Sequence, residues 1–145
     1  MRIAIAGYGI EGRANYEYWN TPDNELVIVD EREVPVDELP LDANVMTGKG
    51  VFEKLEGFDM VVRTASLAPR RINTDGKIWS GTNEFFAQCA ERDISVIGVT
   101  GTKGKGTTSS LIASILRAAG KTAHLVGNIG QPALEVLPDI QAEDI

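Results

Sequence analysis

Short apolar runs alternate along the chain with segments whose apolar residues recur at helical spacing. The apolar runs predict strands at residues 2–6, 26–29, 44–46, 59–63, 95–99 and 122–126. The helical spacing predicts helices at residues 11–19, 83–92, 107–119 and 132–137. Strands that alternate with helices of this length are typical of βαβ units and a mostly parallel sheet. Strands that are apolar throughout indicate a sheet that is covered on both faces.

Residue types at the ends of the predicted helices agree with this pattern. Residues 20–24 read NTPDN, which is the turn chemistry expected after the helix at 11–19. Thr82 or Asn83 is expected to cap the helix at 83–92. Gly120 suits the end of the helix at 107–119. Local chemistry and hydrophobic pattern therefore predict the same elements.

A glycine-rich turn follows the first predicted strand. Residues 7–12 read GYGIEG and fit G-x-G-x-x-G between a strand and a helix, and Asp30 ends the second predicted strand. This context is typical of a dinucleotide fingerprint, in which the helix N-terminus faces a diphosphate and the acid binds a sugar or base. Glu11 is unfavourable beside a diphosphate, although Arg13 and Arg32 can supply counter-charge. A structural turn without a ligand is the alternative.

A second glycine-rich loop, residues 100–108 with the sequence TGTKGKGTT, lies between the predicted strand at 95–99 and the next helix. Small residues let backbone N–H groups curl around phosphate oxygens, and the helix dipole adds positive potential. Lys105 fits the lysine that reaches the β- and γ-phosphates, with Lys103 as the alternative. Thr107 or Thr108 fits the hydroxyl that binds Mg²⁺. A lysine-rich solvated turn is the competing interpretation.

The spacing of this second loop departs from the usual P-loop, G-x-x-x-x-G-K-[ST]. Gly98 lies one residue too far from Gly104 and Lys105, and Gly106 stands where Ser or Thr is expected. The loop therefore predicts a phosphate site of an unusual type.

The two glycine loops divide the chain into two α/β units, with an expected boundary near Arg92 and Asp93. Residues 1–92 are predicted to form a Rossmann-like domain with a parallel sheet. Residues 93–145 contain only two predicted strands, too few for a complete nucleotide-binding domain. We therefore expect the truncated start of a P-loop ATPase-type domain, in a chain that is the N-terminal piece of a larger protein.

Composition narrows the range of partners. The 145 residues are 43% hydrophobic and 24% charged, as in a globular protein, and the formal net charge of −7 disfavours a nucleic-acid interface. The apolar runs are too short to span a bilayer, and the first strand reaches Gly7 too soon for a signal peptide. The single cysteine, Cys89, excludes an internal disulfide and fits a reducing cytoplasm. Cys89 itself is expected to be a small core residue on a helix.

With both loops in view, the sequence resembles the Mur ligase superfamily. The ATP loop of that family, T-G-[ST]-x-G-K-[ST]-T, is matched from Thr100 to Lys105 and needs no glycine at position 98. Gly106 departs from most Mur enzymes and is similar to the G-K-G-[ST] form of folylpolyglutamate synthases, which moves the implied metal ligand to Thr107. The resemblance implies ATP binding by Gly101, Thr102, Lys103, Gly104, Lys105, Gly106, Thr107 and Thr108, with Lys105 catalytic.

Other segments resemble the D-glutamate-adding branch of this family. Residues 127–134, GNIGQPAL, are similar to its G-N-I-G-x-P-A-L segment, in which the Asn contacts the UDP-muramoyl substrate. Residues 30–32 match the family's D-x-R at the uracil site, and residues 10–12 match its turn over the diphosphate. The UDP-substrate residues implied in this way are Gly9, Ile10, Glu11, Gly12, Asp30, Glu31, Arg32 and Asn128. Two departures are Glu11, where the family often has Thr, and residues 64–69, which replace its S-P-G.

The resemblance implies the N-terminal part of an ATP-dependent ligase in peptidoglycan precursor synthesis. Such an enzyme activates UDP-N-acetylmuramoyl-L-alanine as an acyl phosphate, which the amine of D-glutamate attacks. ATP and Mg²⁺ are the implied cofactors, and a cytoplasmic monomer with no nucleic-acid or membrane partner is the implied state. The family's second metal position and most of its amino-acid site come from later segments. The 145 residues alone are therefore expected to bind the UDP-sugar at most, and not to ligate.

Three alternatives remain at the level of sequence. A nicotinamide-dependent oxidoreductase is supported by residues 7–12 but leaves the Lys105 loop unexplained. A non-catalytic nucleotide-binding module is favoured by the short length. A folylpolyglutamate synthase-like ligase is supported by Gly106 alone.

Overall fold

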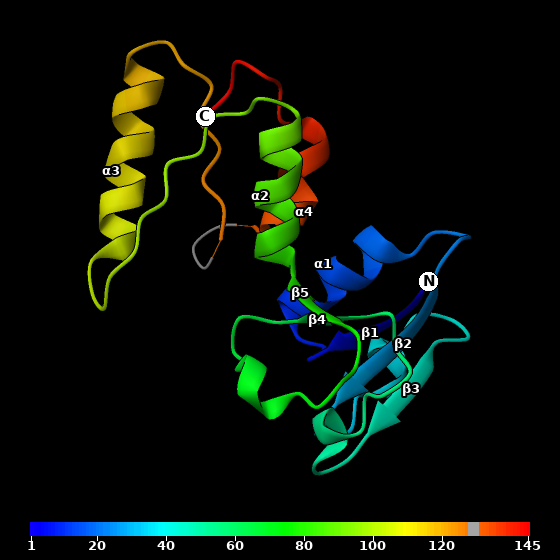
Figure 1. Ribbon diagram of the computed structural model, residues 1–145. Coiled ribbons are helices and arrows are strands. Elements are labelled where there is room, and N and C mark those ends of the chain that lie inside the picture. The colour runs from blue at the N-terminus through cyan, green and yellow to red at the C-terminus, as the bar shows by residue number, and fades with distance from the viewer. Residues whose placement is uncertain (128–130) are drawn as a thin grey trace. The chain divides into compact units, whose positions relative to one another are not determined.

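The computed structural model describes residues 1–127 and 131–145 (Figure 1). The chain forms two compact units, Met1–Asn83 and Glu84–Ile145. The domain boundary expected between residues 92 and 93 stays a prediction. Asn128, one of the expected substrate contacts, lies outside the described residues.

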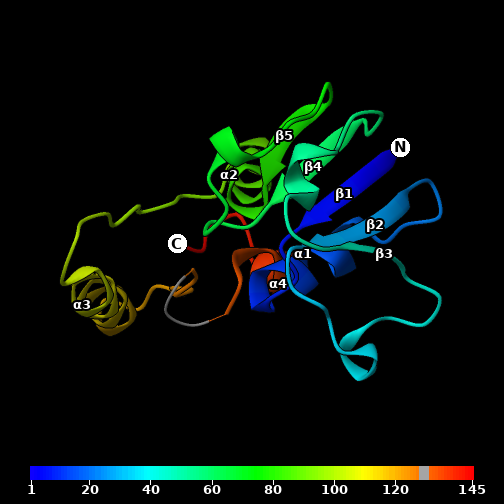
Figure 2. The ribbon, with the colours of Figure 1, turned by 90° about the horizontal axis from the view of Figure 1, so that it is seen from below.

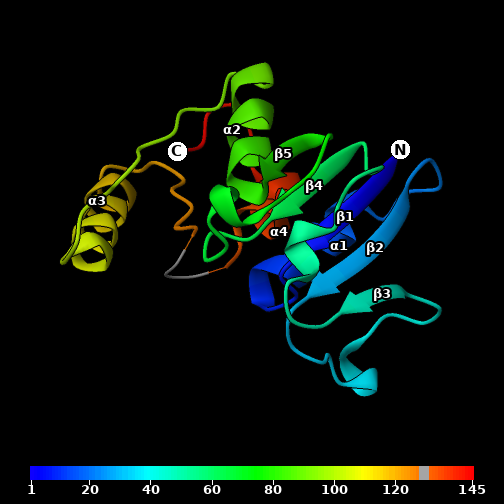
Figure 3. The same ribbon diagram turned by 60° about the horizontal axis from the view of Figure 1, so that its bottom comes forward.

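A parallel five-stranded sheet forms the first unit, and Figure 3 shows its strands side by side. The order is β3-β2-β1-β4-β5, and every neighbouring pair is parallel. This order confirms the predicted Rossmann-like α/β class, whose ligand crevice lies outside the carboxyl ends of the strands where the order reverses. The strands are β1 Arg2–Ala6, β2 Glu25–Asp30, β3 Asn44–Thr47, β4 Met60–Arg63 and β5 Lys77–Ser80.

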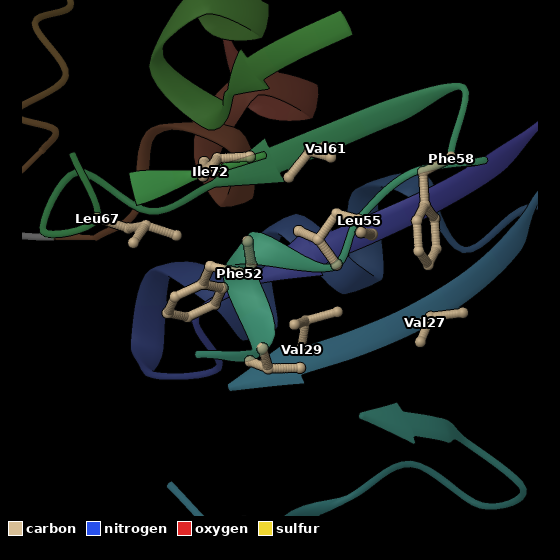
Figure 4. Packing of buried hydrophobic residues seen from close by; sticks show 11 residues of the cluster. Val27, Val29, Phe52, Leu55, Phe58, Val61, Leu67 and Ile72 are labelled. Atoms are coloured by element: carbon tan, nitrogen blue, oxygen red, sulfur yellow. The ribbon is translucent and has the colours of Figure 1, made fainter. Parts of the chain in front are cut away.

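One face of this sheet is covered by the segments that connect the strands (Figure 4). Alternate residues of the central strands, among them Ala6, Val29 and Val61, pack there against Phe52 and Leu55. The covering residues lie around two short 3₁₀ turns, η2 Val51–Glu53 and η3 Pro69–Arg71. A third, η1 Val36–Glu38, has no buried residue. Buried apolar contacts thus hold the loops after β3 and β4 against the sheet.

The intervening strand residues face the other way and are equally buried. Ile3, Ile5, Ile28 and Val62 are fully buried, and helix α1 Ile10–Trp19 contacts β1 and β2. Burial on both faces explains why these strands read as continuous apolar runs.

The start of the next helix, α2 Gly81–Glu91, differs from the expected start at residue 83. The capping group is Ser80, not Thr82 or Asn83. Its Oγ accepts the backbone N–H of Asn83 at 3.1 Å and donates to the Asn83 Oδ1 at 2.6 Å. This is the pattern of a helix N-cap. Ser80 is in this position because it ends β5, a strand that the apolar pattern did not reveal. Cys89, on the same helix, is buried as expected, and desolvation raises the pKa of its thiol.

The second unit contains α3 Lys105–Ala118 and α4 Ala133–Val136, which η4 Leu137–Asp139 follows. Gly120, with φ +79°, ends α3 as expected. Its N–H donates to the Arg117 carbonyl and the N–H of Lys121 to the Leu116 carbonyl, which is the Schellman pattern. No helix of the described residues is long and apolar enough to cross a membrane.

The strands predicted at residues 95–99 and 122–126 are wrong. The first segment runs irregularly from α2 to α3 (Figure 2), and Val96 and Ile97 are 40% and 51% exposed. Within the described ranges neither segment meets a strand with which to form a ladder, and a strand sequence without a partner gains little from extended backbone. The second segment forms an isolated bridge from Val126 to Gln131 and backbone hydrogen bonds between residues 122–124 and Ile145.

The contact between β1 and α1 depends on Gly12. A Cβ built at Gly12 would lie 2.0 Å from the carbonyl oxygen of Gly7, so the backbones approach too closely for any side chain. The third glycine of the motif therefore serves close helix–strand packing.

Gly12→Ala should lower the free energy of unfolding by about 1–3 kcal/mol, because the added methyl group must displace backbone. Urea unfolding followed by tryptophan fluorescence measures this loss. Gly9→Ala is the matched control, since no atom lies within 4 Å of a Cβ at Gly9, and it should cost less than about 1 kcal/mol. Equal losses in the two variants would contradict the packing role of Gly12.

Candidate functional site

A cleft of about 430 Å³ opens in the first unit at the carboxyl ends of β1, β2 and β4. Its lining combines the turn after β1, the end of β2 and the loop after β4. The lining residues are Gly7, Tyr8, Gly9, Ile10, Glu11, Asp30, Glu31, Arg32, Phe52, Thr64, Ser66, Leu67 and Arg71. Apart from Gly12, every UDP-substrate residue expected within the described ranges lies in this lining.

The turn after β1 presents the N-terminus of α1 to this cleft. Gly7 has φ +91°, and a Cβ there would lie 2.7 Å from the Thr64 Oγ1. The first intrahelical hydrogen bond runs from the Arg13 N–H to the Gly9 carbonyl at 2.9 Å. The N–H groups of residues 10–12 therefore have no acceptor within the helix. Such amides, aided by the helix dipole, suit an anionic ligand.

Asp30 fixes this turn from the end of β2. Asp30 as a whole is 5% exposed, and its carboxylate accepts the Tyr8 N–H at 2.9 Å and the Arg32 N–H at 3.0 Å. Burial raises the pKa of Asp30, but the N–H donors of Arg32 and Tyr8 and the Arg32 guanidinium outweigh it, so the pKa lies below its ordinary value. Asp30 is therefore an ionised acceptor built into the turn.

The guanidinium of Arg32 is the replaceable partner of Asp30. Its Nε and Nη2 lie 3.4 and 3.5 Å from the two carboxylate oxygens, which are long hydrogen bonds, and its side chain is 79% exposed. A ligand N–H that approached Asp30 would displace these contacts before the shorter ones from the backbone.

Glu11, which looked unfavourable beside an anion, has a partner in the loop after β4. Its Oε2 accepts the Ala65 N–H at 2.8 Å and so links the first turn of α1 to that loop. Arg63 orders the same loop, because its Nη1 donates to the carbonyls of Thr64 and Leu67 at 3.2 and 3.1 Å. The segment that replaces the family's S-P-G is thus held on both sides.

Glu31, which directly follows β2, also lines the cleft. Its Oε2 accepts a hydrogen bond from the Arg71 Nη2 at 2.8 Å, and its Oε1 accepts the Gly50 N–H at 3.4 Å. The hydrogen bond from Arg71 is the main reason that the pKa of Glu31 lies below its ordinary value. Arg71 is a site residue that no sequence motif indicated.

The second glycine loop leads into α3. Gly101 and Gly104 have φ +149° and +76°, which other residues rarely adopt, and Gly104 directly precedes the helix. The Thr108 N–H donates to the Gly104 carbonyl at 2.9 Å, so the N–H groups of residues 105–107 have no acceptor in the helix. The Lys105 Nζ folds back and donates to the Gly101 carbonyl.

The expected ATP-loop residues lie in two groups. Thr102, Lys103, Gly104, Lys105 and Gly106 line a cavity of about 370 Å³ in the second unit, and its remaining lining is largely apolar. Gly101, Thr107 and Thr108 do not line it and are exposed. Among the described residues no three acidic, histidine or cysteine side chains gather to hold a metal ion.

Curated glutamate ligases match the chain over nearly its whole length. The UDP-N-acetylmuramoyl-L-alanine–L-glutamate ligase of Xanthomonas euvesicatoria is 40% identical over 148 residues, which cover 93% of this chain and 32% of the relative. The corresponding ligase of Xylella fastidiosa is 36% identical over 151 residues, 94% of this chain and 32% of the relative. The UDP-N-acetylmuramoylalanine–D-glutamate ligase of Haemophilus influenzae is 31% identical over 142 residues, with coverages of 93% and 32%. Over nearly its whole length the chain is therefore similar to the N-terminal part of these glutamate-adding Mur ligases.

The match covers nearly all of this chain but only part of each Mur ligase. The chain spans about a third of the length of the curated relatives that it matches. No family model matches the chain. The roles of individual residues in the two loops remain predictions, and so does the role of Asn128.

The loop after β4 adds cleft residues that were not among the expected substrate contacts, although residues 64–69 stand where the family has S-P-G. Thr64, Ser66 and Arg71 lie in the lining, and the Thr64 and Ser66 hydroxyl oxygens are 3.2 Å apart. For Arg71, which lies outside residues 64–69, the available signal was positional, because the loop follows a strand beside the point where the strand order reverses.

The lowered pKa of Asp30 predicts how acid affects the stability of the first unit. A carboxyl whose pKa is lowered by folding contributes stability that is fully present above its unfolded pKa. That contribution is lost as the pH falls through the lower folded pKa. The difference in unfolding free energy between the wild type and Asp30→Asn should be constant above about pH 4 and shrink in more acidic solution. Urea unfolding measured from about pH 6 to about pH 2 tests this, and a constant difference throughout would contradict it.

Proposed function

We propose that this chain is the nucleotide-binding part of a ligase that adds glutamate to UDP-N-acetylmuramoyl-L-alanine at the expense of ATP. The observation that carries this proposal is the presence, in one chain, of two helix N-termini that each follow a glycine-rich loop. One opens into the cleft of the first unit, and the other begins with Lys105. The names of the relatives favour this interpretation over an oxidoreductase, a folate ligase or a non-catalytic module.

In the first unit we assign the UDP part of the substrate to the cleft. The N–H groups of Ile10, Glu11 and Gly12 would bind the diphosphate, and Gly9 leaves room for its approach because nothing lies near its Cβ position. Residues 30–32 would surround the uracil, where Asp30 accepts a ligand N–H in place of the long contacts from Arg32. Asn128 would contact the muramoyl part.

In the second unit we assign the ATP phosphates to residues 101–108. The loop amides would bind phosphate oxygens, and Lys105 would exchange the Gly101 carbonyl for the β- and γ-phosphates. Mg²⁺ supplies further neutralisation of phosphate charge when bound, and Thr107 is the residue that would hold it. Lys105 and the loop amides would thereby stabilise the charge on the γ-phosphoryl group as it moves to the substrate carboxylate.

The stereochemistry of the added glutamate has two candidates. D-glutamate is the one that the residues 127–134 suggested. L-glutamate is the second candidate, because the 40% identical relative is named for L-glutamate and the 31% identical one for D-glutamate. We further propose that the complete enzyme is a cytoplasmic monomer, that its first domain ends near residue 92, and that residues 1–145 alone do not ligate.

The proposal is tested by supplying the complete protein with ATP, Mg²⁺ and UDP-N-acetylmuramoyl-L-alanine, together with D-glutamate or L-glutamate. Phosphate release and the mass of the amide product report turnover. Turnover with D-glutamate supports the first candidate, and turnover with L-glutamate alone supports the second. A folate monoglutamate as the only accepted substrate would contradict both.

Lys105→Ala in the complete protein should abolish ATP-dependent turnover, a loss of about 100-fold or more, because the moving phosphoryl group loses its main cation. Binding of the UDP-sugar, measured by calorimetry, should be unchanged. Lys103→Ala is the matched control from the same loop and should retain most of the turnover. Retained turnover in Lys105→Ala together with its loss in Lys103→Ala would reverse the assignment of the two lysines.

A further inference from the structure

Arg71 occupies a position in the cleft that the proposed function leaves unassigned. It ends η3 in the loop after β4, and its side chain is 51% exposed and lines the cleft with residues 7–11. Two contacts hold its guanidinium, the hydrogen bond from Nη2 to Glu31 and the Phe52 ring, whose centroid lies 5.8 Å from its Cζ. A long cationic side chain is thus placed beside the cleft before any ligand arrives.

The position of Arg71 affects the charge balance of the cleft. Its lining carries three carboxylates, on Glu11, Asp30 and Glu31, and two guanidiniums, on Arg32 and Arg71. Arg32 pairs with Asp30 and Arg71 pairs with Glu31, so Arg71 is the guanidinium that the β4 loop contributes to this lining. A nucleoside diphosphate adds at least two negative charges to this lining. Without Arg71 the carboxylates would outnumber the guanidiniums by two, and binding of the diphosphate would cost more.

The guanidinium can serve two anions at once. It has five N–H donors in a planar fork, and the contact with Glu31 occupies one nitrogen. The remaining donors can form charge-assisted hydrogen bonds with phosphate oxygens while Glu31 keeps the head group in place. A lysine in the same position would offer a single ammonium to both.

We propose that Arg71 binds the diphosphate of the nucleotide substrate from the side opposite the N-terminus of α1, and that Glu31 positions it. This inference rests on the proposed function, because it takes a uridine diphosphate compound as the ligand of the cleft. It adds a specificity-determining residue from the β4 loop, which discriminates nucleoside diphosphates from nucleosides.

Calorimetric titration of the full chain with UDP and with uridine tests the proposal. Arg71→Ala should weaken UDP binding by about 10- to 100-fold, as expected for loss of hydrogen bonds to a charged group, and change uridine binding by less than about twofold. Arg70→Ala, which removes the neighbouring exposed arginine outside the cleft lining, is the matched control and should leave both affinities unchanged. Arg71→Lys should bind UDP with intermediate affinity, since it keeps the charge and loses the fork.

Three results would overturn the assignment. Unchanged UDP affinity in Arg71→Ala, or equal loss of UDP and uridine affinity, would show that Arg71 only shapes the loop. An equal loss of UDP affinity in Arg70→Ala would show that UDP binding responds to the general surface charge and not to Arg71 in particular. Failure of the wild type to bind either UDP or the UDP-sugar would instead overturn the proposed function, and this inference with it.

Discussion

The hydrogen bond from the Tyr8 N–H to Asp30 is the interaction on which the first unit's cleft depends. It joins the end of β2 to the turn after β1, and it is made by a carboxylate that is almost fully buried. A buried carboxylate is stable only when donors surround it, so the turn and the acid require each other. Gly7 and Gly12 then let the chain reverse tightly enough for α1 to begin at the mouth of the cleft. The direction of the helix N-terminus is a consequence of that arrangement.

Similar hydrogen bonds explain how an acidic chain can form the anion site that we propose for the cleft. Each carboxylate of the cleft accepts a hydrogen bond from another segment: Asp30 from Tyr8, Glu11 from Ala65 and Glu31 from Arg71. These acids therefore tie the β1 turn, the β2 end and the β4 loop together. Their charge is balanced locally by donors, which leaves the α1 amides and the remaining N–H donors of Arg71 as the groups that can face a ligand.

The sequence was sufficient where burial alone decides the structure. β1, β2, β4 and α1 lie close to their predicted positions because apolar residues cover both faces of the sheet. β5 was missed because an edge strand that contains Lys77 and a partly exposed Ile78 has no continuous apolar run. The strands at 95–99 and 122–126 were wrong because an apolar run does not supply the neighbour that a ladder requires. Arg71 was missed because the path of η3, which no motif encodes, brings it to the cleft.

Each of the two glycine loops precedes a helix N-terminus, but different contacts hold the two loops in place. In the first unit a buried carboxylate holds the turn, so the amides at the start of α1 are positioned without any ligand. In the second unit the contact that closes the loop comes from Lys105 itself, the residue that we propose reaches the ATP phosphates. An ammonium bound to a carbonyl loses little when a phosphate replaces that carbonyl, because a charged acceptor forms the stronger hydrogen bond. The Gly101 carbonyl thus holds the lysine near the start of α3 at little cost to nucleotide binding, and the loop needs no buried acid.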